Sequence, residues 1–135
     1  MKREEATGQG LCIGWFRSEW PDHYYSIYAV ANERITSPAR GALLKKQGVT
    51  AGVADTHITA PDKKGRILYI EMKILPNKVK KGSTQEQWLE HQAKFGHKTC
   101  VIEGKDRFDL LEQFKTIVKD HMEQYPTIYD QLKSQ

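Results

Sequence analysis

The distribution of apolar and polar residues in the middle of the chain predicts a β-hairpin. The runs at residues 54–59 and 66–75 are rich in β-branched and aliphatic residues. Between them, Pro61-Asp62-Lys63-Lys64-Gly65 has the proline and glycine that are typical of a turn. We therefore expect two antiparallel strands joined by this turn.

The length of the turn sets the register of the hairpin. In a simple antiparallel hairpin Ala60 faces Arg66, and counting back along both strands then brings Asp55 opposite Glu71. Lys73 lies two positions beyond Glu71 and so shares its face of the sheet. The alternate positions of the second strand are expected to point into a core: Leu68, Ile70, Met72 and Ile74.

Further elements are predicted on both sides of the hairpin. Towards the N-terminus, the pattern predicts a helix over residues 4–20, a strand over 24–30, and a helix over 38–47 with Ser37 as its N-cap. Towards the C-terminus, it predicts a helix over 84–96, a strand over 98–103 and a long helix from Asp106. Pro126 is expected to break that last helix, leaving 127–135 as a polar tail.

Two of these helices carry apolar stripes. The helix at 84–96 is expected to face inward through Trp88, Gln92 and Phe95. The stripe of the last helix fits either the core of the monomer or a dimer face, and includes Phe114, Val118, Met122 and Tyr125. Alternating helices and strands of these lengths predict an α/β domain with a mixed central sheet flanked by helices.

Composition is consistent with one globular domain over residues 1–135. The chain has 135 residues, of which 39% are hydrophobic and 28% charged, and its net charge is +4. The positive charge favours a polyanionic partner. Cys12 and Cys100 have no metal-ligand spacing and are expected to be free thiols in a reducing compartment. We find no membrane-spanning run or signal pattern, so we expect a cytoplasmic protein.

The predicted pairing of Asp55 with Glu71 raises an electrostatic question. Two opposed carboxylates repel one another and would destabilise a sheet. A hard divalent cation such as Mg²⁺, held by carboxylate oxygens and waters, would offset that repulsion. Lys73 beside them could orient an attacking water or stabilise developing negative charge. The same residues also fit a surface hairpin with a Glu–Lys pair and an unrelated aspartate.

A second acidic candidate, Asp62, is rejected. It follows Pro61 and forms a literal "PD" ahead of Glu71-Met72-Lys73. However, nine residues of extended strand separate Asp62 from Glu71, on the order of 25–30 Å. Asp62 therefore cannot share a metal with Glu71, and its place in a turn has a local backbone reason.

Basic residues gather in two segments of the chain. The first, on and before the predicted helix at 38–47, contains Arg34, Arg40, Lys45 and Lys46, and the second, a loop after the hairpin, contains Lys78, Lys80 and Lys81. Either group is consistent with a solvated charged surface or with a track for the phosphates of DNA. Glycines bracket the loop at 48–52, between these two basic segments, which indicates that its backbone approaches something closely.

Several segments together resemble the virus-type replication-repair nuclease (VRR-NUC) domain of the PD-(D/E)XK, or restriction-endonuclease-like, superfamily. The resemblance covers about residues 4–118 and is carried by Asn32-Glu33, Leu44-Lys45-Lys46-Gln47-Gly48-Val49, Gly52-Val53-Ala54-Asp55, Tyr69-Ile70-Glu71-Met72-Lys73 and Thr84-Gln85-Glu86-Gln87-Trp88, closed by Gly96. The sequence departs from the family at Ala54, where proline is usual. Proline there shapes the backbone and supplies no catalytic group.

The resemblance implies roles for particular residues. Asp55 and Glu71 would be metal carboxylates, with the backbone carbonyl of Met72 as a further ligand, and Lys73 would be the catalytic lysine. Gln87 would match the family's glutamine on the following helix. Glu5 would be the acidic residue of the first helix, with Glu4 as the alternative.

The resemblance also implies a function. It suggests a Mg²⁺- or Mn²⁺-dependent DNA endonuclease, bacterial or phage-encoded, which acts as a homodimer on branched DNA such as four-way (Holliday) junctions. Resolving a junction needs two symmetry-related cuts, and a two-fold dimer supplies the second active site. Tyr24, Tyr25 and Tyr28 offer apolar surface for such an interface. Two alternatives are a sequence-specific restriction-type endonuclease and a non-catalytic DNA-binding module that keeps the fold.

Overall fold

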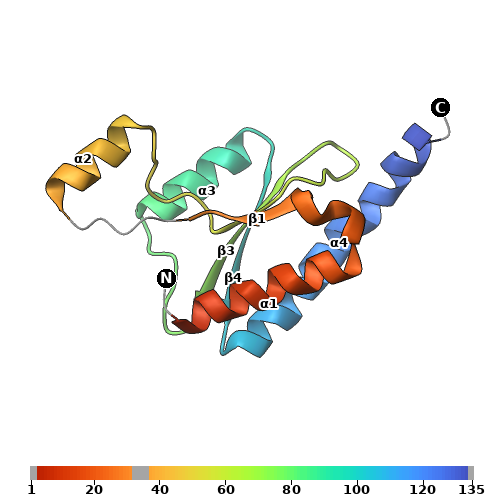
Figure 1. Cartoon of the computed structure of the whole chain (residues 1–135), viewed down its shortest axis with the longest axis horizontal. Helices are drawn as coiled ribbons and strands as arrows, with labels where there is room; N and C mark the ends of the chain where they lie inside the picture. The colour runs from red at the N-terminus through yellow and green to blue at the C-terminus, as the bar shows by residue number, and fades with distance from the viewer. Residues whose placement is uncertain (1–2, 32–36, 134–135) are drawn as a thin grey trace.

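The structure, a computed structural model, describes residues 3–31 and 37–133, with side chains as far as residue 123. Within these residues, four strands and four α-helices follow one another, together with one 3₁₀ helix, η1 (Figure 1). In chain order the elements are α1 (Arg3–Glu19), η1 (Pro21–Ser26), β1 (Ile27–Ala29), α2 (Pro38–Lys46), β2 (Thr56–Ile58), β3 (Leu68–Ile74), α3 (Thr84–Lys94), β4 (Lys98–Gly104) and α4 (Arg107–Lys133).

The four strands form one mixed sheet in the order β1-β2-β3-β4. β1 and β3 both run antiparallel to β2, whereas β4 runs parallel to β3. Thr56 pairs with Ile70 and Ile58 with Leu68, which is the register predicted from the turn. Asp55 directly precedes β2, so the same register continued by one residue brings it opposite Glu71.

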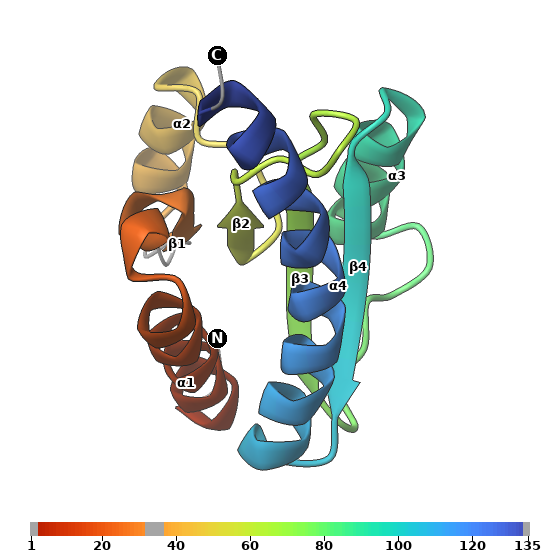
Figure 2. The same ribbon diagram turned by 90° about the vertical axis from the view of Figure 1, so that its right-hand side faces the viewer.

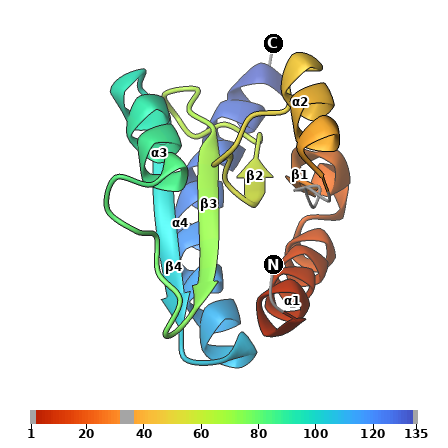
Figure 3. The ribbon, with the colours of Figure 1, turned by 90° about the vertical axis from the view of Figure 1, so that its left-hand side faces the viewer.

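Helices cover both faces of this sheet. α4 crosses one face, in front of β3 and β4 in Figure 2 and behind β3 in Figure 3, with α1 alongside it. α3 packs against the other face, where Trp88 contacts Tyr69 of β3. The core lies between the sheet and the α1–α4 layer and includes Cys12, Phe16, Ile58, Ile70, Met72, Ile102, Leu110 and Phe114. The predicted α/β architecture is confirmed.

Strand β3 lies between the apolar core and a face with ionisable groups, because its side chains alternate between the two faces of the sheet. Leu68, Ile70 and Met72 are buried in the core, as predicted. Glu71 and Lys73 point to the opposite face, which α3 covers only in part. This strand therefore carries hydrophobic packing on one side and ionisable groups on the other.

The predicted strand at residues 24–30 is wrong in its first half. Residues Pro21–Ser26 form the helix η1, and only Ile27–Ala29 form a strand. The guanidinium of Arg17 donates hydrogen bonds to the carbonyls of Tyr24 and Ile27, and it stacks 3.8 Å from the centre of the Tyr24 ring. These tertiary contacts from α1 outweigh the local strand propensity of the tyrosines.

The end of the last helix also differs from the prediction. α4 begins as expected, with Asp106 accepting hydrogen bonds from the backbone amides of Phe108 and Asp109. It then continues past Pro126 to Lys133 instead of breaking. A proline removes one backbone donor from a helix, and an otherwise regular helix can continue beyond that local loss.

The apolar stripe of α4 completes the monomer core. Phe114, Val118 and Met122 are all buried, so they are not free to form a dimer face. The side chain of Tyr125 lies outside the described residues. None of the described helices is both long enough and apolar enough to cross a membrane.

Candidate active site

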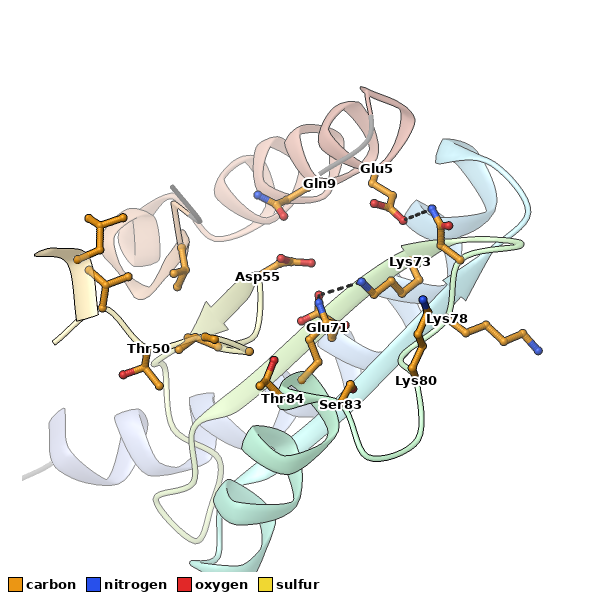
Figure 4. Close-up of a pocket in the computed structure, with 18 of the residues that line it drawn as sticks. Glu5, Gln9, Thr50, Asp55, Glu71, Lys73, Lys78, Lys80, Ser83 and Thr84 are labelled. Carbon is orange, nitrogen blue, oxygen red and sulfur yellow. Dashed lines mark hydrogen bonds and ion pairs between the residues drawn. The ribbon is translucent and has the colours of Figure 1, made fainter. Parts of the chain in front are cut away.

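A cleft of about 1190 Å³ opens on the face of the sheet that carries Glu71. Its walls come from five parts of the chain: α1, Val30 just after β1, α2 with the loop that follows it, Asp55 with Glu71 and Lys73 of β3, and the segment from Pro76 to the start of α3. Figure 4 shows Asp55, Glu71 and Lys73 near its centre, with Glu5 and Gln9 above them. The cleft therefore brings together residues that are distant in sequence.

Asp55 and Glu71 form the centre of this cleft. Only 5% of Asp55 and 1% of Glu71 is exposed to solvent. The backbone amide of Met72 donates a 3.3 Å hydrogen bond to Asp55 Oδ2, which fixes the aspartate beside β3. In a strand the N–H and C=O of one residue point to the same side, so the Met72 carbonyl also points towards Asp55.

Glu71 is only partly satisfied by its neighbours. Its Oε1 atom lies 3.5 Å from the Gln85 amide nitrogen and 3.8 Å from Lys73 Nζ. Its Oε2 atom is buried and has no hydrogen-bond partner among the described residues. Burial raises the pKa of Glu71 well above its usual range, and the adjacent Asp55 carboxyl raises it further, while Lys73 opposes the shift.

The first helix contributes Glu5 to the cleft. Glu5 is 5% exposed, and its Oε1 accepts hydrogen bonds from the Ile74 amide at 3.0 Å and the Asn77 side chain at 3.3 Å. Glu4 instead forms an ion pair with Arg107 at 2.9 Å and does not line the cleft. The choice of Glu5 over Glu4 therefore agrees with the positions of the two side chains.

On α3 a different glutamine from the predicted one lies at the site. Gln87, the residue expected at the site, is exposed and donates to the carbonyl of Gly82, so it does not reach the carboxylates. Gln85 lines the cleft and contacts Glu71. Trp88 packs against Tyr69 of the sheet as expected, but Leu89 is the buried residue of this helix, and Phe95, expected to face inward, is 66% exposed. The inward face of α3 is therefore shifted relative to the prediction.

Gln9 is a cleft residue that is not among the site residues predicted from the sequence. It lies one turn after Glu5 on α1 and points into the cleft (Figure 4). Its Oε1 atom is buried and has no hydrogen-bond partner among the described residues. An unsatisfied buried amide is costly, so this side chain is suited to bind something that enters the cleft.

The glycine-bracketed loop is fixed by close packing. A Cβ atom on Gly52 would collide with the carbonyl of Thr84, in the first turn of α3, and the glycine has a φ of +87°. Only glycine fits both conditions. This contact holds the loop that leads to Asp55 against α3 and confirms the predicted close approach of the backbone.

The basic residues divide into two groups. Lys45, Lys78 and Lys80 line the cleft, and Lys78 also lies 3.9 Å from Glu103. Three others are exposed and do not line it: Arg40, Lys46 and Lys81. Arg34 lies outside the described residues. The cleft therefore has cationic groups at both ends, on α2 and on the loop before α3.

His57 lies beside the site within an aromatic cluster. Its ring stacks on Trp88 with 14° between the planes, and its Nε2 lies 3.1 Å from the Ala54 carbonyl. Burial lowers its pKa, which favours the neutral ring. His57 therefore packs beside the site and does not itself line the cleft.

Asp62 has a different environment from the cleft acids. One of its oxygens accepts from the amides of Lys64 and Arg66, and the other lies 2.7 Å from the Arg66 guanidinium. Although burial opposes ionisation, these hydrogen bonds lower its pKa to about 2. Asp62 stabilises the turn, as its rejection from the site predicted.

The chemistry of the site fits a hard divalent cation. Among the described residues, no group of three or more His, Cys, Asp and Glu side chains is placed to hold a metal. However, Mg²⁺ is commonly bound by one or two carboxylates with several waters. Asp55, Glu71 and the Met72 carbonyl would supply such a set, and a cation would satisfy the unpartnered oxygen of Glu71.

Comparison with known proteins supports the fold. No protein-family model matches the chain, and no curated protein matches it. A solved structure described as a VRR_NUC domain protein is similar, with a TM-score of 0.65 and 21% sequence identity over 92% of each chain. The similarity extends over nearly the whole length of both proteins, and the chain therefore has the fold of a VRR-NUC domain.

Proposed function

We propose that this protein is a metal-dependent phosphodiesterase that hydrolyses DNA. The observation that carries the proposal is the buried Glu71 carboxylate, which lines the same cleft as Asp55 and has one oxygen without a hydrogen-bond partner among the described residues. A stable protein has no structural use for an unsatisfied buried acid beside a second acid. The pair is explained if it binds a cation during catalysis.

Each cleft residue has a distinct task in this mechanism. Asp55, Glu71 and the Met72 carbonyl would hold Mg²⁺ or Mn²⁺. When bound, such an ion polarises a phosphate oxygen and lowers the pKa of a water. The Lys73 ammonium would orient the attacking water or stabilise the additional negative charge on the phosphate.

Residues further from the centre would position these groups. Gln85 donates to Glu71 and so limits the orientations of that carboxylate. Glu5 is held by two donors at the end of β3, where it can accept a hydrogen bond from a water. Both act by orientation, in which small displacements are costly to catalysis.

DNA would be held mainly through its phosphates. Lys45, Lys78 and Lys80 face the cleft from opposite ends, and the chain has a net charge of +4. Such contacts fix the position of a strand without reading its sequence. We therefore propose recognition of DNA shape rather than of a short sequence.

The substrate is proposed to be branched DNA, such as a four-way junction, cut by a homodimer. The chain carries a single candidate site among its described residues, so paired cuts require a second copy. Tyr25 is 91% exposed and Tyr24 is 50% exposed beside β1, at one edge of the sheet, where they could contribute to an interface.

Cleavage assays test the proposal directly. Labelled four-way junction, flap, duplex and single-stranded DNA are incubated with the protein in Mg²⁺, in Mn²⁺ and in EDTA. We expect metal-dependent cleavage, strongest on a branched substrate. Tight binding without cleavage in either metal would favour the non-catalytic module, and cutting at one short sequence would favour the restriction-type enzyme.

Metal binding can be measured without turnover. Calcium or magnesium should raise the melting temperature of the wild-type protein, since a ligand that binds only the folded state stabilises it. The shift should disappear in Glu71→Gln, which keeps the shape of the side chain and removes its charge. Light scattering at micromolar concentration tests the dimer separately.

A further inference from the structure

The two ends of the cleft differ in chemistry. The end next to the loop before α3 is polar and basic, and includes Lys73, Asn77, Lys78, Lys80 and Ser83. The end next to α2 is largely aliphatic, and is lined by Val30, Leu44, Val49, Ala51 and Val53, with Lys45 among them. We name this second region the aliphatic alcove.

The alcove is open to a ligand. Val49 is 50% exposed although it lines the cleft, whereas Leu44 is 6% exposed and anchors α2 beneath it. An aliphatic wall contributes nothing to binding a phosphate or a cation, so the carboxylates and lysines do not explain it. The cleft volume of 1190 Å³ also exceeds what one phosphodiester group occupies.

Double-stranded DNA offers little that matches such a wall. Its surface consists of charged phosphates and sugars, and the apolar faces of its bases are stacked on one another. An unstacked base, in contrast, exposes a flat apolar face that can pack on protein side chains. Every base has such a face, so this packing does not depend on the DNA sequence. An unstacked base offers the larger apolar face to such a wall, whereas intact duplex DNA exposes only sugar carbons and thymine methyl groups.

We infer that the aliphatic alcove receives an unstacked nucleobase adjacent to the scissile phosphate. The inference rests on the proposed nuclease function and specifies its substrate. Lys45 would contact the phosphate of the unstacked nucleotide, while Val49 and Val53 pack against its base. DNA with unpaired or weakly paired nucleotides next to the cut would be preferred over continuous duplex, because less stacking is lost on entry.

The loop that forms the alcove is suited to this role. Gly52 packs directly against Thr84 at the start of α3, so the wall is held at a fixed position relative to Asp55. Valine side chains form no hydrogen bonds, so such a wall selects a ligand by shape and does not distinguish one base from another. Selection for branched or single-stranded DNA then follows from the ease of unstacking.

A fluorescent base tests the inference in the wild-type protein. Cuts are first mapped on a junction or flap, and 2-aminopurine is then placed next to the mapped position, with binding measured in EDTA to prevent cleavage. We expect fluorescence to rise several-fold on binding, because unstacking relieves quenching and an aliphatic wall does not restore it. The same probe ten or so nucleotides away should not respond.

Two matched variants test the alcove itself. Val49→Trp fills it, whereas Leu43→Trp alters an equally exposed residue, 46% against 50%, that does not line the cleft. We expect Val49→Trp to slow cleavage roughly tenfold and Leu43→Trp to leave it within about twofold. A substrate lacking the base at the probe position should be cut equally well by Val49→Trp and wild type.

The outcomes separate this inference from the proposed function. If the wild type cleaves DNA but 2-aminopurine stays dark and the two tryptophan variants behave alike, the alcove is not a base site and the nuclease stands. If Val49→Trp is slow on the abasic substrate too, its effect is structural and the inference also fails. If no DNA is cleaved under any condition, both proposals fall.

Discussion

Asp62 and Glu71 belong to the same hairpin and are almost equally buried, with 0% and 1% of their surfaces exposed. Their environments are nevertheless opposite. Each oxygen of Asp62 meets a donor from Arg66, and Lys98 lies 3.7 Å away. Glu71 has an oxygen with no hydrogen-bond partner in the described part of the chain, and a second carboxylate lies beside it.

The pKa values of the two acids express this difference. Hydrogen bonds lower the pKa of Asp62 to about 2, so it is charged in the folded protein and contributes to its stability. Burial raises the pKa of Glu71, so its charged form is unfavourable until a cation arrives. A buried acid with all its partners in place is a structural residue, and one that lacks them is available for a ligand.

The largest expected effect is on activity. Asp55→Asn should lower the rate of DNA cleavage by at least about 10³-fold, because the amide cannot hold a cation as a carboxylate does. DNA binding in EDTA should change little. The matched variant Asp62→Asn should cleave at close to the wild-type rate at a temperature where it is folded. Loss of activity in Asp62→Asn with retention in Asp55→Asn would reverse the assignment.

At Asp62 the expected effect of substitution is on stability rather than on activity. Asp62→Asn should lower the free energy of unfolding by about 2–3 kcal/mol at neutral pH, since it leaves buried donors without an anion. The stabilisation by ionised Asp62 is present above its unfolded pKa of 3.8 and is lost as the pH falls towards about 2. The gap between variant and wild type, measured by urea denaturation, should therefore close in acid. A constant gap would mean that the charge of Asp62 is not the cause.

Glu71→Gln should stabilise the metal-free protein while abolishing its activity. A raised pKa makes the wild type most stable below the unfolded pKa of 4.5, and that stability is lost as the pH rises. The variant avoids this loss, so we expect it to be about 1–2 kcal/mol more stable at about pH 8 and no different below about pH 4.5. Lower stability of Glu71→Gln at alkaline pH would contradict the raised pKa.

The contrast between the two acids was accessible from the sequence through the turn. Pro61 and Gly65 identified the turn, its length placed Asp55 opposite Glu71, and the same count put Asp62 too far away. The observed pairing of Thr56 with Ile70 confirms that register. A hairpin register depends on local chain geometry, which is why a short stretch of sequence suffices to predict it.

Long-range packing was not accessible in the same way. The inward face of α3 includes Leu89 together with Trp88 and leaves Phe95 exposed, and packing against the rest of the protein decides this. Gln87 was therefore expected where Gln85 is found. Local propensity predicts a strand at Tyr24, but its contact with Arg17 of α1 holds it in η1. That contact joins two different elements and so cannot be predicted from the local pattern. Neither contact leaves a periodic signal.

The two glutamines offer a finer test of what surrounds Glu71. Gln85→Ala should reduce the cleavage rate about tenfold, because it removes the amide that orients the Glu71 carboxylate. Gln87→Ala should leave it within about twofold, since Gln87 only contacts Gly82 at the surface. Single-turnover kinetics separates this effect from DNA binding. A larger effect at Gln87 would show that α3 has the phase predicted from the sequence.

The smallest expected effect is on DNA binding, and it separates lysines with structural partners from lysines that are available for DNA, as Asp62 differs from Glu71. Lys98 is committed to Asp62 and to His121, whose Nδ1 lies 2.8 Å away, whereas Lys80 lines the cleft and no ion pair within the described chain includes it. Lys81 is its exposed neighbour outside the cleft.

If Lys80 contacts one phosphate, Lys80→Ala should weaken DNA binding about twofold to fivefold for unrelated sequences and reduce the slope of log affinity against log salt by about 0.9. Lys81→Ala should leave that slope unchanged, because a lysine outside the cleft releases no counterion from a strand bound within it. Equal slopes for both variants, measured by fluorescence anisotropy over a salt series, would mean that DNA does not follow the cleft past Lys80.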